Sequence, residues 1–131
     1  MKKFLTIAFT LLLATHMLVS QSSRLTEQAT GIAPFAAFFD AVDPDSGVIQ
    51  PELINNRRAY ADFSYSWDFG DNTNSYWPNS NKSRNHDIGY IASHVYDSPG
   101  NYTVTLRVRD KNGSLHSYTQ TITVQDPNLV F

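Results

Sequence analysis

Two alternating segments near the C-terminus constrain the fold more than any other feature of the chain. In residues 102–109 apolar side chains alternate with threonine and arginine, and in a second segment Tyr118, Ile122 and Val124 share one face. Residues 110–113, Asp-Lys-Asn-Gly, are typical of a tight turn. Because alternation is the period of a half-buried strand, the two segments predict an antiparallel β-hairpin.

The chain between residue 23 and this hairpin also lacks helical periodicity. Residues 61–69 alternate as the hairpin does. Further segments of strand composition are 33–41 and 88–96. Two segments rich in turn-forming residues, 40–58 and 72–87, predict surface loops, the first with a helical turn at 51–55. We therefore expect an all-β domain, a two-sheet β-sandwich of about seven strands, with a closed barrel as the alternative.

The N-terminus has the order of a secretory signal peptide. Lys2 and Lys3 precede an apolar run, residues 4–13, which is followed by a stretch with small residues. Threonine and histidine interrupt this segment, whereas a transmembrane anchor needs about 20 apolar residues. We expect a secreted, periplasmic or cell-surface protein with no stable membrane anchor. The predicted parts are a signal peptide at 1–22, a polar leader at 23–32, the sandwich at 33–125 and a tail at 126–131.

Composition and charge exclude several functions. The chain has no cysteine, so a secreted domain of this size must be held together by core packing, and thiol catalysis and cysteine zinc sites are excluded. Removal of Lys2 and Lys3 with the signal peptide takes the net charge from -2 to -4. This mild acidity provides no basic patch for nucleic acid. We expect a monomer that binds no nucleic acid and needs no cofactor.

Two separated motifs resemble the PKD domain family. Residues 67–71 read WDFGD, the signature of that family, and residues 94–106 are similar to its second motif, an H-x-Y turn followed by PG-x-YTVTL. The matching residues are Trp67, Asp68, Phe69, Gly70, Asp71, His94, Tyr96, Pro99, Gly100 and Tyr102. The resemblance implies an immunoglobulin-like sandwich in which these side chains are structural, with Trp67 in the core and Tyr102 at a tyrosine corner.

The same resemblance implies a noncatalytic function. PKD domains serve as spacers, adhesion modules or interaction domains in cell-surface proteins and secreted bacterial enzymes, so the expected partner is an extracellular protein or a polysaccharide surface. The alternatives are a carbohydrate-binding module, or the N-terminal fragment of a polysaccharide-processing protein that continues into a right-handed parallel β-helix. The apolar Leu129, Val130 and Phe131 after the last strand predict such a truncated junction, unless they cover a sheet edge.

Aromatic residues are the strongest candidates for a binding site. The loop at residues 72–93 is longer than the corresponding turn of the family pattern. Binding specificity usually depends on loops. This segment contains Tyr76, Trp77 and Tyr90, whose rings could stack on a sugar or anchor in a pocket of a partner. The alternative is a buried lid over the edge of the sandwich.

Carboxylates offer two further sites. Asp68 and Asp71 could form an acid and base pair, but turns use aspartate to accept bonds from backbone amides, which explains both residues better. Asp40, Asp43 and Asp45 resemble a loose calcium loop, because calcium prefers several oxygen ligands from one flexible segment. A solvated turn is the alternative there.

Histidine adds no convincing chemistry. His86, Asp87 and His94 could supply metal ligands, but His94 belongs to the family turn, and zinc needs three or four converging ligands. The chain also has no G-x-S-x-G nucleophile motif. The sequence therefore nominates no catalytic residue, and we expect a protein that is not an enzyme.

Overall fold

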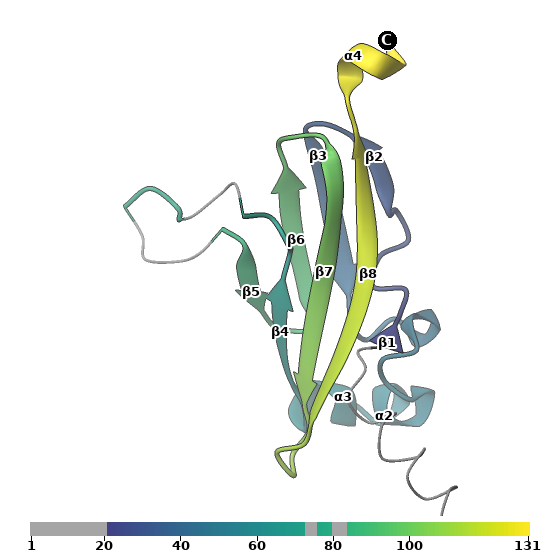
Figure 1. Ribbon diagram of the computed structural model, residues 1–131. Coiled ribbons are helices and arrows are strands. Elements are labelled where there is room, and N and C mark those ends of the chain that lie inside the picture. Colours follow the sequence, from purple (N-terminus) through teal and green to yellow (C-terminus); the bar gives the residue numbers. More distant parts are fainter. Residues whose placement is uncertain (1–20, 73–75, 80–83) are drawn as a thin grey trace, which may run out of the picture.

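The computed structural model describes residues 21–72, 76–79 and 84–131, which form two packed β-sheets (Figure 1). The strands are β1 (Gln21–Ser22), β2 (Thr30–Ile32), β3 (Phe35–Asp40), β4 (Ser64–Asp68), β5 (His86–Ile88), β6 (Ile91–Tyr96), β7 (Gly100–Arg109) and β8 (Leu115–Gln125). The larger sheet has the order β1-β8-β7-β4-β5, with β2 also paired to β8, and the smaller sheet is β3-β6. The all-β, two-sheet prediction is confirmed. The predicted signal peptide lies outside the described residues, apart from β1.

The C-terminal hairpin forms as predicted. Strands β7 and β8 pair antiparallel from Gly100 opposite Val124 to Arg109 opposite Leu115. In the turn, the Asp110 carboxylate accepts bonds from the backbone amides of the two residues at 112 and 114, at 2.9 and 3.0 Å. The hairpin therefore has the local geometry that an aspartate-led turn sequence favours.

The core lies between the two sheets. Strand β3 contributes Phe39, and β4 contributes Trp67, which is 1% exposed. The ring of Phe39 lies 5.5 Å from the rings of both Trp67 and Phe69. Burial of side chains of this size contributes about 1.5–3 kcal/mol each, so these aromatic contacts hold the sheets together in the absence of disulfides.

The segment predicted as a polar leader belongs to the sandwich. Leu25 is 1% exposed and lies in the core. The side-chain oxygen of Gln120 accepts the backbone N–H groups of Leu25 and Thr26 at 2.6 and 2.9 Å. Strands β1 and β2 both pair parallel with β8. A single leucine among polar residues has no periodicity, so only its partners in β8 reveal that this segment is packed.

Short helices occupy the loop between β3 and β4. They are the 3-10 helix η2 (Pro44–Ser46), α2 (Pro51–Asn55) and α3 (Arg58–Ala61). The predicted helical turn at 51–55 is confirmed by α2. This loop is not wholly at the surface, because Val42, Val48, Ile49 and Ala59 are buried against the core.

The single strand predicted at 88–96 is instead two strands in different sheets. The chain turns at Gly89, whose φ is +107°, and Tyr90, so that β5 pairs with β4 while β6 pairs with β3. The continuous strand composition of this segment gave no sign of the turn, apart from Gly89 itself. As a result, β5 and β6 face one another at one side of the sandwich, each at the edge of its sheet.

The last residues form the short helix α4 (Pro127–Val130), which extends beyond the end of the sheets in Figure 1. Leu129 and Phe131 are 86% and 94% exposed, so they do not cover a sheet edge. No helix within the described ranges is long and apolar enough to cross a membrane.

Candidate functional site

The WDFGD segment forms a turn in which the carboxylate of the first aspartate, Asp68, accepts hydrogen bonds. One oxygen of the Asp68 carboxylate accepts bonds from the backbone N–H of Gly70 and the side-chain amide of Asn85, both at 2.9 Å. Gly70 has a φ of +69°, and a Cβ there would meet the backbone carbonyl of Thr103. The Trp67 indole N–H donates to the carbonyl of Gly89 at 2.7 Å. These contacts give the motif a structural role.

The second aspartate joins the two motifs through a buried pair. The Asp71 carboxylate lies 2.9 Å from Nε2 of His94, and both side chains are buried. The His94 ring stacks on Phe69 at 4.7 Å and meets the edge of Tyr96 at 4.6 Å. The Tyr96 hydroxyl donates to the carbonyl of Phe69 at 2.9 Å. Burial, together with the charge of Asp71, raises the pKa of Tyr96.

Tyr102 closes the same region at the start of the hairpin. Its hydroxyl donates to the carbonyl of Ser98, four residues upstream, at 2.6 Å. This is the hydrogen bond of a tyrosine corner. The family motifs thus form one network of structural contacts between β4, β6 and β7, and their acidic groups already have partners inside it.

A groove of about 690 Å³ opens beside this network, between β5 and β6. Phe69 and His94 form its buried end, while Ile88 of β5 and Val95 of β6 line its walls. The remaining lining residues are Trp77, Arg84, His86, Asp87 and Ser93. The groove combines apolar walls with charged and aromatic groups, as small-molecule and peptide sites commonly do.

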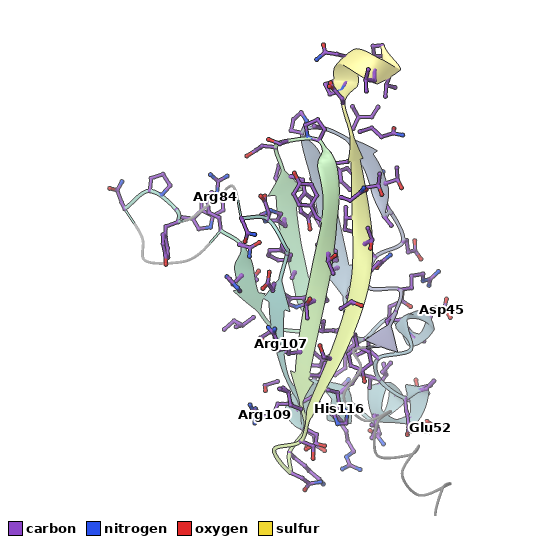
Figure 2. The ribbon with its side chains drawn as sticks, viewed as in Figure 1. Asp45, Glu52, Arg84, Arg107, Arg109 and His116 are labelled. Carbon is purple, nitrogen blue, oxygen red and sulfur yellow. The ribbon has the colours of Figure 1, made fainter. Side chains whose placement is uncertain are left out.

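Trp77 and Arg84 make the most distinctive contact of the groove. The Arg84 guanidinium carbon lies 4.7 Å from the centroid of the Trp77 ring, a cation–π contact. Such contacts contribute about 0.5–1 kcal/mol at exposed sites, enough to favour one orientation of both side chains. Trp77 is still 54% exposed. Arg84 also forms a long ion pair with Asp97, at 3.9 Å. Figure 2 shows Arg84 beside β5, on the opposite side of the sandwich from Asp45.

The structure does not bring the three predicted aromatic residues together. Tyr76 is exposed next to Trp77, but it does not line the groove. Tyr90 packs edge-on against Tyr60, with 4.9 Å between the ring centroids, and lies 6.3 Å from Tyr65. Tyr90 therefore belongs to a separate aromatic cluster. The sequence reasoning missed Arg84, although it is a cation only seven positions from Trp77.

The three aspartates predicted as a calcium loop already have partners in the described structure. The Asp40 carboxylate accepts the backbone N–H of Val42, and Asp43 accepts that of Asp45, each at 2.9 Å. The guanidinium of Arg24 lies 3.5 Å from Asp43 and 3.2 Å from Asp45. Arg24 thus pairs with two of the three aspartates, and calcium binding at this loop stays a prediction.

Each histidine candidate likewise lies close to one aspartate, His86 to Asp68 and His94 to Asp71. His86 lies 3.5 Å from Asp68, and the Asp87 carboxylate accepts the backbone N–H of Ile88 at 2.8 Å. Within the part of the chain that the structure describes, no group of three His, Cys, Asp or Glu side chains is placed to share a metal ion.

The fold and the two linked motifs define a class of protein, the β-sandwich module with a WDFGD turn. The chain belongs to the PKD domain family, whose model matches residues 55–125.

The solved structures that resemble the chain include the following two. The first, described in work on carbohydrate-binding modules of the β-sandwich superfamily, is 23% identical over 83% of this chain, with a TM-score of 0.51. The second, the PKD domain of an M14-like peptidase from Thermoplasmatales archaeon SCGC AB-540-F20, is 18% identical over 79% of this chain and 93% of its own, with a TM-score of 0.44. The chain spans 36% of the length of the first structure. At these identities the likeness concerns the fold.

Proposed function

We propose that this domain is a noncatalytic extracellular module that binds a partner in the groove between β5 and β6. The observation that carries the proposal is the half-exposed Trp77 ring, held under the Arg84 guanidinium at a groove of about 690 Å³. Exposed aromatic and arginine side chains are enriched where proteins bind partners.

The hydrogen bonds and the ion pair of the two motif carboxylates support the noncatalytic part of the proposal. Asp68 accepts hydrogen bonds from the Gly70 backbone and the Asn85 side chain, and Asp71 is buried against His94. An acid or base catalyst must reach a substrate proton, and a buried, paired carboxylate is poorly placed to do so. A spacer, adhesion or protein-interaction role fits these contacts.

Carbohydrate is the second candidate ligand. Trp77 offers an exposed ring for a sugar face, with the polar groups of Arg84, His86 and Asp87 lining the same groove. A structure described in work on carbohydrate-binding modules of the β-sandwich superfamily shares this fold over 36% of its length. The same groove could therefore hold a glycan chain.

The experiment compares the purified chain with Trp77→Ala and, as the matched control, Tyr76→Ala. Both rings are exposed neighbours, but only Trp77 lines the groove. Retention on cellulose, chitin or xylan that is lost in Trp77→Ala and kept in Tyr76→Ala would support a carbohydrate site. Equal behaviour of the two variants would rule out a site at Trp77. Turnover of these polysaccharides by the parent chain would contradict the noncatalytic proposal.

The junction predicted for residues 126–131 stays a prediction. The exposed Leu129 and Phe131 of this segment would suit contact with a following domain. The coding sequence downstream of Phe131 tests this prediction, because a β-helix reading frame there would support it.

A further inference from the structure

In the described part of the chain, strand β6 has one unpaired edge along the groove. It pairs with β3 over its whole length, from Ile91 opposite Asp40 to Tyr96 opposite Phe35. Among the described residues, no other strand pairs with it. In an antiparallel pair, alternate residues of a strand direct their N–H and C=O groups away from the partner. Those groups of β6 therefore point toward β5, where Ser93, His94 and Val95 line the groove.

The other edges of the described sheets are short or covered. On the outer side of β3, the carbonyl of Leu25 accepts the backbone N–H of Asp40 at 3.0 Å, and residues 25–28 line a hollow of about 330 Å³ beside the strand. Strand β5 has only three residues, and the strands that pair along β8 are as short, with two residues in β1 and three in β2. Strands β3 and β6 both have six residues, but only β6 lacks a backbone hydrogen bond to a further described segment on its outer side.

The composition of β6 does not protect this edge. Proteins usually protect exposed edges with lysine, proline, a bulge or a charge that points inward. Strand β6 reads Ile-Ala-Ser-His-Val-Tyr and contains neither lysine nor proline, and its one inward-pointing ionisable residue, His94, is already paired with Asp71. The outer face of the β3–β6 sheet is apolar. Ile91 of β6 is 60% exposed there, and Phe38 of β3, opposite Ser93, is 70% exposed. Such an edge suits pairing with another strand.

We propose that β6 receives an extended segment of a partner protein as an added strand of the smaller sheet. This inference rests on the proposed function, because it names the class of partner for the same groove. Alternate side chains of an added strand point to opposite faces. One set would enter the groove against Phe69 and Ile88, and the other would lie over the outer face beside Ile91.

Charge at the mouth of the groove indicates one further feature of the segment. Arg84 lies over Trp77, and its ion pair with Asp97 is long, at 3.9 Å. An acidic side chain on the partner segment could pair with this guanidinium more closely, because arginine binds carboxylates in a two-pronged geometry. The expected partner is therefore an extended segment with alternating apolar residues and an acidic residue near the Arg84 end.

The test selects binders to the full purified chain from a displayed library of random short peptides. The best peptide is then synthesised unmodified and in two backbone N-methylated forms. One form carries methyl groups on its odd-numbered residues and the other on its even-numbered residues. A strand pairs through only one of its edges, so one methylated form should lose about tenfold or more in affinity while the other binds like the parent. Amide exchange of β6 should slow when the peptide binds.

A second variant tests the role of Arg84. Arg84→Gln should weaken binding of a selected peptide that has an acidic residue, and it should leave unchanged the affinity of the same peptide with that residue replaced by its amide. Trp77→Ala provides the comparison for carbohydrate binding, as described above.

Other outcomes separate the two proposals. If both methylated forms bind like the parent peptide and β6 amides exchange as before, the added strand is refuted. If no peptide is selected but polysaccharide retention depends on Trp77, the added strand fails while the groove keeps its binding function. If neither peptides nor polysaccharides bind, both proposals fail. If the chain dimerises with slowed β6 exchange in the absence of peptide, a second copy occupies the edge and the partner-protein inference is wrong.

Discussion

Replacement of Gly70 by alanine tests whether the WDFGD turn stabilises the fold. Gly70 lies in the left-handed region, with a φ of +69°, and the position of an added Cβ is occupied by the backbone of Thr103. The left-handed conformation costs an L-residue about 1–2 kcal/mol. Overpacking against a neighbour that cannot rotate away adds about 1–3 kcal/mol. Gly70→Ala should therefore lower the free energy of unfolding by about 2–5 kcal/mol.

Gly47→Ala is the matched control for this change. Gly47 has nearly the same φ, +73°, but a Cβ there would meet no atom within 4 Å. This variant should lose only the conformational part, about 1–2 kcal/mol. The difference between the two variants isolates the contact between the turn and the backbone of Thr103.

Urea unfolding of the parent and both variants measures these free energies from the midpoint and slope of each transition. We expect Gly70→Ala to be the less stable variant by at least about 1 kcal/mol, with all slopes equal. Equal losses in the two variants would refute the reasoning, because they would show that the turn and Thr103 can move apart freely.

Three further predictions concern the same network and the core. Tyr102→Phe removes the bond to the Ser98 carbonyl and should lower the free energy of unfolding by about 1 kcal/mol in urea titrations; an unchanged midpoint would contradict it. Asp71→Ala leaves His94 buried without its partner and should destabilise by about 3–5 kcal/mol, measured as a fall in melting temperature; a fall no larger than that of Tyr102→Phe would argue against the pair. Burial, with smaller contributions from neighbouring charges, raises the pKa of Tyr65 from 10.0 to about 12. Because the folded state favours the neutral hydroxyl, this stabilisation is complete below pH 10 and is lost as the pH rises toward about 12. The part of the tyrosinate absorbance that is lost in Tyr65→Phe should therefore appear together with unfolding above pH 10, and its full appearance in a folded chain at pH 10 would contradict the prediction.

Much of the fold followed from local patterns in the chain. The alternation in residues 102–109 reports that one face of a strand is buried, and this is a property of neighbouring residues. The turn residues at 110–113 reverse the chain through their own side-chain bonds. The hairpin, the central position of Trp67 and the family were accessible without the structure, because each depends on short-range spacing.

Only part of the candidate site could be predicted from the sequence. Trp77 stood out as an aromatic residue in a polar loop, and the structure leaves it half-exposed at a groove. Tyr90 looked equivalent in the sequence but packs on Tyr60. Residue type alone does not say which way a ring points, so an exposed and a packed tyrosine give the same signal.

The sequence by itself therefore determined the class of fold, the hairpin and the motif turn, since these arise from contacts between residues close along the chain. Tertiary structure decided the rest. It divided the strand composition at 88–96 between two sheets, brought Leu25 into the core and placed β5 opposite an edge of β6 that no other described strand pairs with. The groove exists because two edges from different sheets face each other, and strand periodicity specifies which side of a strand is buried without specifying what lies beside its edge.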